Sequence, residues 1–353
     1  MGRILSAFTI LAIFSSGCTN EKVTTSGNVP QDVYVAGFVE AGLSSQNNVA
    51  VYWKNGTLNV LATSPDPPVP IPNASSNGAM TSSIFVSGTG LIYAAGTNSG
   101  QAVYWQNGKA VELALNASAN SIFVTGSGDV YVAGRTNNQS TPIASYWKNG
   151  TPVSLTSGSN VDNANSIFVS SAGDVYVAGS TVVSESPGFS SAVYWKNGTQ
   201  VVLNYGAANA VAKSIIVTGN DVYVAGYIQD LVNHTTVATY WKNGIAYSLP
   251  DPSNFSFSTS IFVTGTGDVY LAGFVNGNPT TIAAYWKNGV SFPLSANGVV
   301  TDVSSIVVSP SGDIYVSGTV GQHAVYWKNN ELQMLNDNGA NGSVATSIFL
   351  HSN

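Results

Sequence analysis

The sequence is poor in charged residues, in cysteine and in long apolar runs. Aspartate, glutamate, lysine and arginine make up 8% of its 353 residues, about a third of the usual share. The formal net charge is -6 and lysine and arginine form no cluster, which argues against a surface that follows nucleic-acid phosphates. The only cysteine, Cys18, excludes an internal disulfide, so packing and hydrogen bonds must hold the fold.

The motifs of common catalytic and cofactor sites are also missing. The sequence holds no G-x-S-x-G, H-E-x-x-H or C-x-x-C, no phosphate-binding glycine loop and no aspartate-rich calcium loop. Its three histidines fall in different segments: His234, His323 and His351. We expect His351 to follow the last strand, near the face opposite to the other two. We therefore expect no metal, no cofactor and no histidine-based catalytic triad.

The most apolar run, residues 4–14, is too short to span a bilayer, which needs about 20 apolar residues. It follows one arginine and leads through small residues to Cys18, the order of a targeting segment. The stretch resembles a bacterial lipoprotein signal, with residues 16–18 matching the lipobox, although Ser15 replaces its usual leucine. The resemblance implies that Cys18 is lipidated. An ordinary cleaved signal with an unmodified thiol is the alternative.

This interpretation divides the chain into three parts. Residues 1–17 are the signal peptide, residues 18–31 the lipidated cysteine and a polar flexible tether, and residues 32–353 a single folded domain. Thr19 is not the aspartate that retains such lipoproteins in the inner membrane of enteric bacteria. We therefore expect an outer-membrane protein, periplasmic or surface-facing, that meets the membrane through its lipid anchor alone.

Internal repeats fill the folded part. All seven tryptophans occur in one phrase, of which "AVYWKNG" is typical: Trp53, Trp105, Trp147, Trp195, Trp241, Trp286 and Trp327. They recur about every 45 residues, the period of a propeller blade or a solenoid repeat. Between them lies a second phrase, for example "SIFVTGSGDVYVAG" at 121–134.

Each repeat indicates four short strands. "SIFV" and "DVYVAG" are joined by a Gly/Ser/Asp turn, and "AVYWK" turns through Asn-Gly, the strongest short hairpin signal. The strands are almost continuously apolar, so we expect both faces of each small sheet to be covered. Seven such sheets predict an all-β, seven-bladed β-propeller with four antiparallel strands in each blade.

The two ends of the chain complete this prediction. The first repeat starts at "QDVYVAG", residues 31–37, without its own first strand, whereas the chain ends on an isolated "SIFL" at 347–350. We expect the C-terminal strand 347–350 to pair with the first repeat and close blade 1. The repeats resemble those of seven-bladed bacterial propeller lipoproteins, and the likeness covers residues 31–353. It implies a fold more than an activity.

Propeller topology assigns the connections of each blade to two faces. The turns between the first and second strands and between the third and fourth strands are short and alike, and we call their side the uniform face. The remaining connections differ in length and content and form the variable face, where recognition is expected. The residue after each "AG" or "SG" is the first one expected to approach the variable face. Four of these residues are candidate binding residues: Phe38, Arg135, Tyr227 and Phe274.

Three repeated residue types have both a structural and a functional interpretation. The tryptophans can wedge blades together or stack on sugars. Aspartates of the first turn and lysines of the second can form a ring of alternating charge for docking, or the aspartates can accept backbone N–H bonds in their turns. Serines that open the first strands can face the central channel and a ligand, or be small because the centre is crowded: Ser83, Ser121, Ser166, Ser214, Ser260, Ser305 and Ser347.

We expect a monomeric, non-enzymatic envelope protein that serves as a protein-binding or adhesion scaffold through its variable face. Its ligand is a protein or a glycan, not nucleic acid. Two alternatives stay open: a carbohydrate-binding lectin, and a propeller glycoside hydrolase or other hydrolase, which needs convergent carboxylates. The carboxylates expected on the variable face include Glu40, Asp162, Glu185, Asp230 and Asp302.

Overall fold

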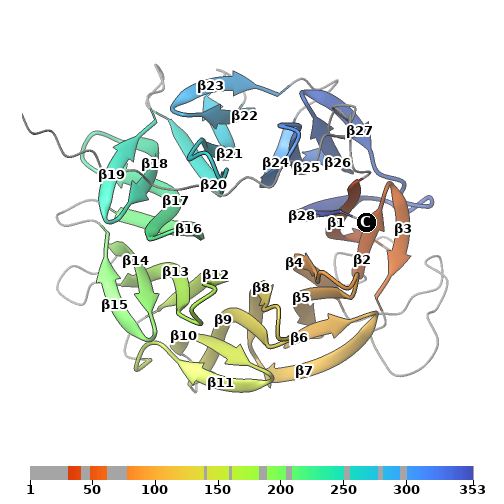
Figure 1. The fold of residues 1–353 in the computed structure, drawn as a ribbon, viewed down its shortest axis with the longest axis horizontal. Coiled ribbons are helices and arrows are strands. Elements are labelled where there is room, and N and C mark those ends of the chain that lie inside the picture. Colours follow the sequence, from red (N-terminus) through yellow and green to blue (C-terminus); the bar gives the residue numbers. More distant parts are fainter. Residues whose placement is uncertain are drawn as a thin grey trace, which may run out of the picture.

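The computed structural model describes residues 31–40, 48–61, 78–138, 141–158, 161–182, 189–203, 209–249, 255–276, 281–294 and 300–352. Over these residues the chain forms 28 strands in seven four-stranded antiparallel sheets. The sheets stand around one axis (Figure 1), so the predicted seven-bladed β-propeller is confirmed. This described part of the chain holds no helix that is long and apolar enough to cross a membrane.

Each blade contributes one strand to each of four concentric positions, seen in Figure 1. The innermost strands, in blades 1 to 7, are β28 (Ser343–Ser352), β4 (Ala79–Val86), β8 (Ser118–Val124), β12 (Asn163–Val169), β16 (Asn209–Thr218), β20 (Ser256–Val263) and β24 (Val300–Val308). The second strands are β1 (Gln31–Glu40), β5 (Ile92–Asn98), β9 (Val130–Asn138), β13 (Val175–Val182), β17 (Asp221–Asp230), β21 (Val269–Asn276) and β25 (Ile314–Val320).

The third strands are β2 (Asn48–Lys54), β6 (Gln101–Gln106), β10 (Thr141–Lys148), β14 (Ser190–Lys196), β18 (Thr235–Lys242), β22 (Thr281–Lys287) and β26 (His323–Lys328). The outermost strands are β3 (Thr57–Val60), β7 (Lys109–Leu115), β11 (Thr151–Ser154), β15 (Thr199–Val202), β19 (Ile245–Ser248), β23 (Val290–Pro293) and β27 (Glu331–Met334).

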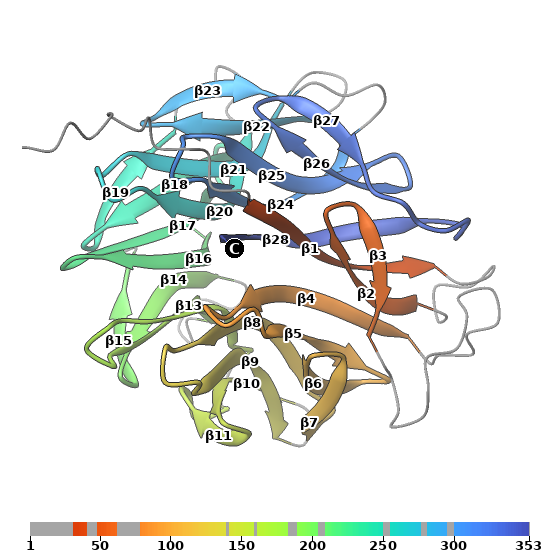
Figure 2. The ribbon, with the colours of Figure 1, turned by 45° about the vertical axis from the view of Figure 1, so that its right-hand side comes forward.

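Blade 1 is closed by the C-terminal strand, as predicted. Its sheet has the order β28-β1-β2-β3, with β28 beside β1 (Figure 2). Within this pairing, Ile348 is opposite Val35. The strand is longer than the expected 347–350, because pairing continues from Ser343 to Ser352. His351 therefore lies within a strand rather than after it. Phe349 also reaches blade 2, where its ring centroid is 5.0 Å from that of Phe85.

The Asn-Gly turns have the geometry that their sequence predicts. Asn149 and Gly150 have φ values of 50° and 83°, and the Asn-Gly pairs of the other blades repeat them. Two successive positive φ values define a type I′ turn, whose twist matches that of a β-hairpin. Each third strand is therefore returned as an outermost strand by a tight two-residue connection.

A β-bulge in every innermost strand explains the recurring "AG" or "SG". In blade 3, Ser121 pairs with Ala133 and Ala119 pairs with Gly134, so Asn120 is left out of the ladder. The backbone crowds Gly134 at this bulge, and an added Cβ would collide with the carbonyl oxygen of Ser118. Glycine is needed here because of the close approach of two backbones, not because of an unusual φ.

The inner three strands of each blade are covered on both faces, whereas the outermost strands are not. Residues 175–180 of β13 are all buried, but all four residues of β19 and of β23 are exposed. The expectation that both faces are covered is thus wrong for the rim. The reason is geometric: blades diverge as they leave the axis, so an outermost strand has no close neighbouring blade.

Candidate functional site

The uniform face carries one repeated polar unit in six blades. In blade 4, Asn197 Nδ2 donates to Asp174 Oδ1 at 2.8 Å, and Lys196 Nζ lies 2.9 Å from Asp174 Oδ2. Asn197 Oδ1 accepts the backbone N–H of Val175 at 2.8 Å, and Lys196 Nζ lies 5.3 Å from the centroid of the Tyr176 ring. The unit fastens the turn between the third and fourth strands to the start of the second strand.

The same ion pair recurs with N···O distances of 2.7 to 3.8 Å. The pairs are Lys54–Asp32, Lys148–Asp129, Lys196–Asp174, Lys242–Asp221, Lys287–Asp268 and Lys328–Asp313. Each lysine meets the aspartate of its own blade. The charges are therefore neutralised within each blade.

The structure also corrects the expected role of the aspartates within their turns. Asp174 accepts side-chain bonds from Asn197 and Lys196, and its own backbone N–H donates to Ser170 Oγ at 3.1 Å. These bonds lower the pKa of Asp174, chiefly through Asn197 and then Lys196. The bond to Asp174 is the main cause that raises the pKa of Lys196 to about 12.

Blade 2 is the exception on this face. Leu91 and Gln106 replace the aspartate and lysine, and Gln106 Nε2 donates to the Tyr93 hydroxyl at 3.2 Å. Asn107 Oδ1 still accepts the backbone N–H of Ile92 at 2.9 Å. The asparagine therefore maintains the turn without the ion pair.

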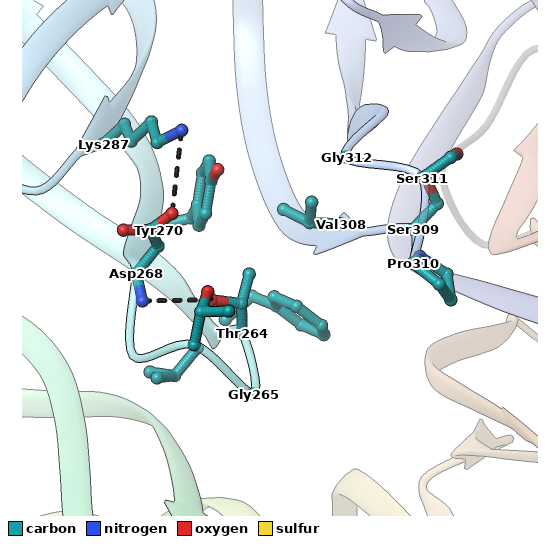
Figure 3. A pocket seen from close by; sticks show the side chains of 13 residues that line it. Thr264, Gly265, Asp268, Tyr270, Lys287, Val308, Ser309, Pro310, Ser311 and Gly312 are labelled. Carbon is teal, nitrogen blue, oxygen red and sulfur yellow. Dashed lines mark hydrogen bonds and ion pairs between the residues drawn. The ribbon is translucent and has the colours of Figure 1, made fainter.

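Shallow grooves separate neighbouring blades on the uniform face. One, of about 580 Å³, runs between blades 6 and 7 (Figure 3) and is lined by Tyr270, Asp268 and Lys287 on one side and residues 308–312 on the other. Another, of about 350 Å³, lies between blades 2 and 3. The Lys287 ammonium lies over the Tyr270 ring and pairs with Asp268 (Figure 3). The polar groups of this groove are thus engaged with each other.

The tryptophans are packing wedges. All seven side chains are 0 to 1% exposed. Trp53 packs among Tyr315, Ala324 and Leu335 of blade 7, and its Nε1 donates to the Asn336 carbonyl at 2.7 Å. A fully buried indole offers no face to a sugar, so the interpretation of these residues as sugar platforms is wrong.

The repeated serines link adjacent blades. Six of the seven hydroxyls accept the backbone N–H of the isoleucine in the next innermost strand: Ser83 from Ile122, Ser121 from Ile167, Ser166 from Ile215, Ser214 from Ile261, Ser260 from Ile306 and Ser347 from Ile84, at 3.2 to 3.4 Å. The last bond crosses the point where the ends of the chain meet. These serines act in packing at the crowded centre.

The structure describes the four candidate binding residues of the variable face. Phe38 and Tyr227 are half-buried, and Arg135 is exposed with Nη1 3.5 Å from Asn163 Oδ1. Phe274 is 5% exposed and lies in the core between blades 6 and 7. Burial raises the pKa of the Tyr227 hydroxyl.

Tyr227 and Phe274 are joined by a residue that the sequence did not single out. The Phe257 ring lies 6.2 Å from that of Tyr227 and 5.1 Å from that of Phe274, and the half-exposed Phe255 lies 6.1 Å away. Its position in the repeat could have identified Phe257 from the sequence. It lies three residues before the repeated Ser260, at the variable-face end of an innermost strand.

That position forms a ring, which we call the variable ring: Val344, Met80, Ser118, Asn163, Val211, Phe257 and Asp302. Its members pair with the residues after "AG" or "SG", for example Ser118 with Arg135 and Val211 with Tyr227. All seven are partly or fully solvent-accessible. Their chemistry changes from blade to blade, whereas the residue after each repeated serine is always isoleucine.

The carboxylates and histidines of the variable face are mostly engaged locally. Asp162 is buried and accepts the N–H of Val182 at 3.2 Å, and Asp230 accepts three bonds from its own turn. Burial raises the pKa of Asp162 and of Asp302. His323 Nδ1 lies 3.1 Å from Asp337 Oδ2. Among the residues described, no group of three or more His, Cys, Asp and Glu can hold a metal ion.

Two earlier candidates, Cys18 and Glu185, lie outside the described residues. Glu40 Oε2 lies beside Gly342, where the ends of β1 and β28 meet. The described carboxylates therefore include Asp302 at the axis, but no pair that the structure brings together there.

No family model and no curated protein matches this sequence. Among solved structures, a polysaccharide lyase of family 25, an ulvan lyase, is 9% identical with a TM-score of 0.49 over 87% of this chain and 90% of that one. Inactive virginiamycin B lyase from Staphylococcus aureus is 13% identical with a TM-score of 0.48, over 73% and 85%. A Bacteroides caccae protein of unknown function is 14% identical with a TM-score of 0.44, over 92% and 100%. These likenesses concern the propeller fold alone.

Proposed function

We propose that the chain is a non-enzymatic binding scaffold that holds one protein partner on the axis of its variable face. The variable ring supports this proposal, because its seven side chains belong to six different residue types and surround one axis. Repeated binding sites would need repeated chemistry, whereas an uneven ring suits one asymmetric partner.

The residue composition of the variable face fits a protein interface. Met80 in blade 2 is 37% exposed, and Phe255 in blade 6 is 40% exposed beside the half-buried Phe257. Arg135 and Asp302 add charge to the same face. Protein interfaces combine an aromatic or methionine-rich centre with a polar rim, and arginine is enriched among their energetically important residues.

The two alternatives lack such support. A lectin using the tryptophans is excluded by their burial, and a lectin using the grooves of the uniform face would bind several equivalent ligands. A hydrolase needs two carboxylates near each other, but Asp162 and Asp230 are bonded within their own blades. We further propose that the scaffold is a monomer held at the outer membrane by a lipid on Cys18.

A crosslinking experiment tests the proposed surface. Met80 and Leu91 belong to the same blade and are both 37% exposed, but they lie on opposite faces. A photo-crosslinking amino acid at position 80 is expected to capture a specific envelope protein in whole cells, and the same amino acid at position 91 is not. Capture from position 91 alone would contradict the proposal.

The captured protein is then identified, purified and titrated against defined variants. Met80→Ser combined with Arg135→Ala should weaken its binding by at least about tenfold, or about 1.4 kcal/mol, with an unchanged melting midpoint. Leu91→Ser is the matched control and should bind normally. Equal binding by all variants, or a glycan titration that gives several equal sites, would overturn the proposal.

A further inference from the structure

The bulge in each innermost strand places one side chain at a special position, immediately before the repeated serine. We call these residues the bulge ring: Thr346, Ser82, Asn120, Asn165, Lys213, Thr259 and Ser304. Six are short and polar. Four of these donate to a carbonyl of the next blade: Asn120 to Ala164, Asn165 to Ala212, Ser304 to Ala345 and Thr346 to Thr81, at 2.6 to 2.9 Å.

Lys213 departs from this pattern. It is the charged member of the bulge ring, and its ammonium group makes no hydrogen bond or ion pair with any residue that the structure describes. The side chain is exposed, although its neighbour Ala212 is fully buried. Because the innermost strands surround the axis (Figure 1), the solvent that reaches Lys213 is the solvent at the axis.

The lysines of the uniform face differ from Lys213 in having a counter-charge. Those at the uniform face each have an aspartate within 3.8 Å or less. Lys213 instead has a lowered pKa, because the surrounding blades desolvate its charge. The side chain still reaches solvent. A partly desolvated charge without a counter-charge is unfavourable, and a bound anion relieves that cost.

We infer that Lys213 is an anion-binding residue that receives a carboxylate of the ligand on the axis. This inference rests on the proposed function and specifies the partner: an acidic side chain or chain terminus would enter from the variable face. The bulge ring lies two residues inward from the variable ring, about 7 Å along a strand. Asn165 and Thr259 of the neighbouring blades lie at the same level, where Asn165 Nδ2 donates to the Ala212 carbonyl and the Thr259 hydroxyl donates to the Ala272 carbonyl.

Asp302 limits which ligands fit. It belongs to the variable ring in blade 7 and is half-buried. A ligand covered with negative charge would be repelled there, whereas one acidic group on an otherwise neutral segment can pass. The geometry therefore favours a single carboxylate over a polyanion.

The test uses the purified full chain with isotope-labelled lysine. Titration with sodium acetate at constant ionic strength should give a saturable shift of the Lys213 side-chain NMR signal. The signal of Lys109, an exposed lysine at the start of β7, should follow only the bulk change. Inorganic phosphate serves as a second probe. If phosphate saturates and acetate does not, the carboxylate assignment is wrong.

A matched variant completes the test. Lys213→Thr introduces the residue that occupies this position in blades 1 and 6, so it is expected to fold. Acetate should raise the melting midpoint of the wild type through preferential binding to the folded state, and Lys213→Thr should weaken that binding by at least about tenfold, or about 1.4 kcal/mol. Lys109→Thr should behave as wild type. Equal stabilisation of both variants, or equal shifts of both lysine signals, would overturn the inference.

The outcome separates this inference from the proposed function. If the Met80 and Arg135 variants lose the partner while Lys213→Thr binds acetate as well as the wild type does, only the anion site is wrong. If acetate binding depends on Lys213 but no partner depends on Met80 or Arg135, only the protein-binding scaffold is wrong.

Discussion

The two faces of the ring use the same repeat in opposite ways. On the uniform face, the repeated Asp, Asn and Lys are bonded within one blade, as Asp174, Asn197 and Lys196 are. At the variable-face end of the innermost strands, the equivalent residues include Met80, Asn163 and Asp302, which share no chemistry. The same residue types recur where every blade must stabilise the same backbone turn. Residues that differ between blades are free of that constraint and can serve recognition.

Blade 2 sharpens the comparison, because it lacks the ion pair and keeps the same turn. Asn107 still accepts the N–H of Ile92, while Leu91 and Gln106 stand where other blades have charges. The asparagine is thus the residue that the turn needs, and the turn forms without the ion pair. We therefore expect perturbations of backbone and closure to have large effects and perturbations of charge to have small ones.

The largest effect should come from opening the ring. Truncation after Thr346 removes Ile348, which is 5% exposed, and Phe349, which contacts Phe85. Each large apolar side chain that loses its burial costs about 1.5 to 3 kcal/mol, against a typical domain stability of about 5 to 15 kcal/mol. We expect an unfolded or aggregated product in circular dichroism and light scattering. Removal of Asn353 alone is the control, and a truncated chain that melts as a normal monomer would contradict ring closure.

A backbone collision should come next. Gly134→Ala places a Cβ against the Ser118 carbonyl, and overpacking of this kind costs about 1 to 3 kcal/mol or more. Gly126→Ala is the matched control in the same blade, because no atom lies within 4 Å of its added Cβ. Denaturant unfolding should show a large loss for the first variant and a change within about 0.5 kcal/mol for the second. Equal losses would mean that the bulge does not determine the glycine.

Loss of one link between blades should have a moderate effect. Ser121→Ala leaves the Ile167 N–H without the hydroxyl that accepts it at 3.2 Å, and such a loss costs about 1 kcal/mol. Ser171→Ala, at an exposed turn position of blade 4, is the control and should be near neutral. If both variants unfold at the same denaturant concentration, the serine ring contributes nothing to holding the blades together.

The smallest effect should come from the ion pairs of the uniform face. Hydrogen bonds from asparagine or lysine lower the pKa of four of the aspartates: Asp129, Asp174, Asp221 and Asp313. Their contribution to stability is present above the ordinary aspartate pKa of about 3.9 and is lost as the pH falls through the lowered values. For Lys196 it is present below the ordinary 10.5 and lost as the pH rises through about 12.

NMR titration of the carboxyl groups tests whether Asn197 lowers the pKa of Asp174 more than Lys196 does. Lys196→Gln copies blade 2 and should move the pKa of Asp174 only part of the way to its ordinary value, because Asn197 still donates. The melting midpoint should change little, since exposed ion pairs contribute little. An Asp174 that titrates at the ordinary value in the wild-type protein would contradict the assigned bonds.

Much of the fold could be predicted from particular residues. The seven YWKN phrases set the blade count, Asn149 and Gly150 specify a type I′ turn, and the isolated "SIFL" indicates ring closure. The candidate site was less predictable. Tyr227 and Phe274 follow a pattern in sequence, but Phe274 is in the core and Phe257 connects them. Which residue of one blade meets the next depends on packing between segments about 45 residues apart in the chain.

The sequence alone therefore determined the blade, the number of blades and the way the ring closes, because each depends on local turn chemistry and on the period of a short pattern. Only the tertiary structure decided what those residues do across blades. It buried the tryptophans, bonded the serines to neighbouring isoleucines and set Lys213 apart at the axis. The physical reason is that burial and electrostatic pairing depend on neighbours in space, and in this ring those neighbours come from other repeats.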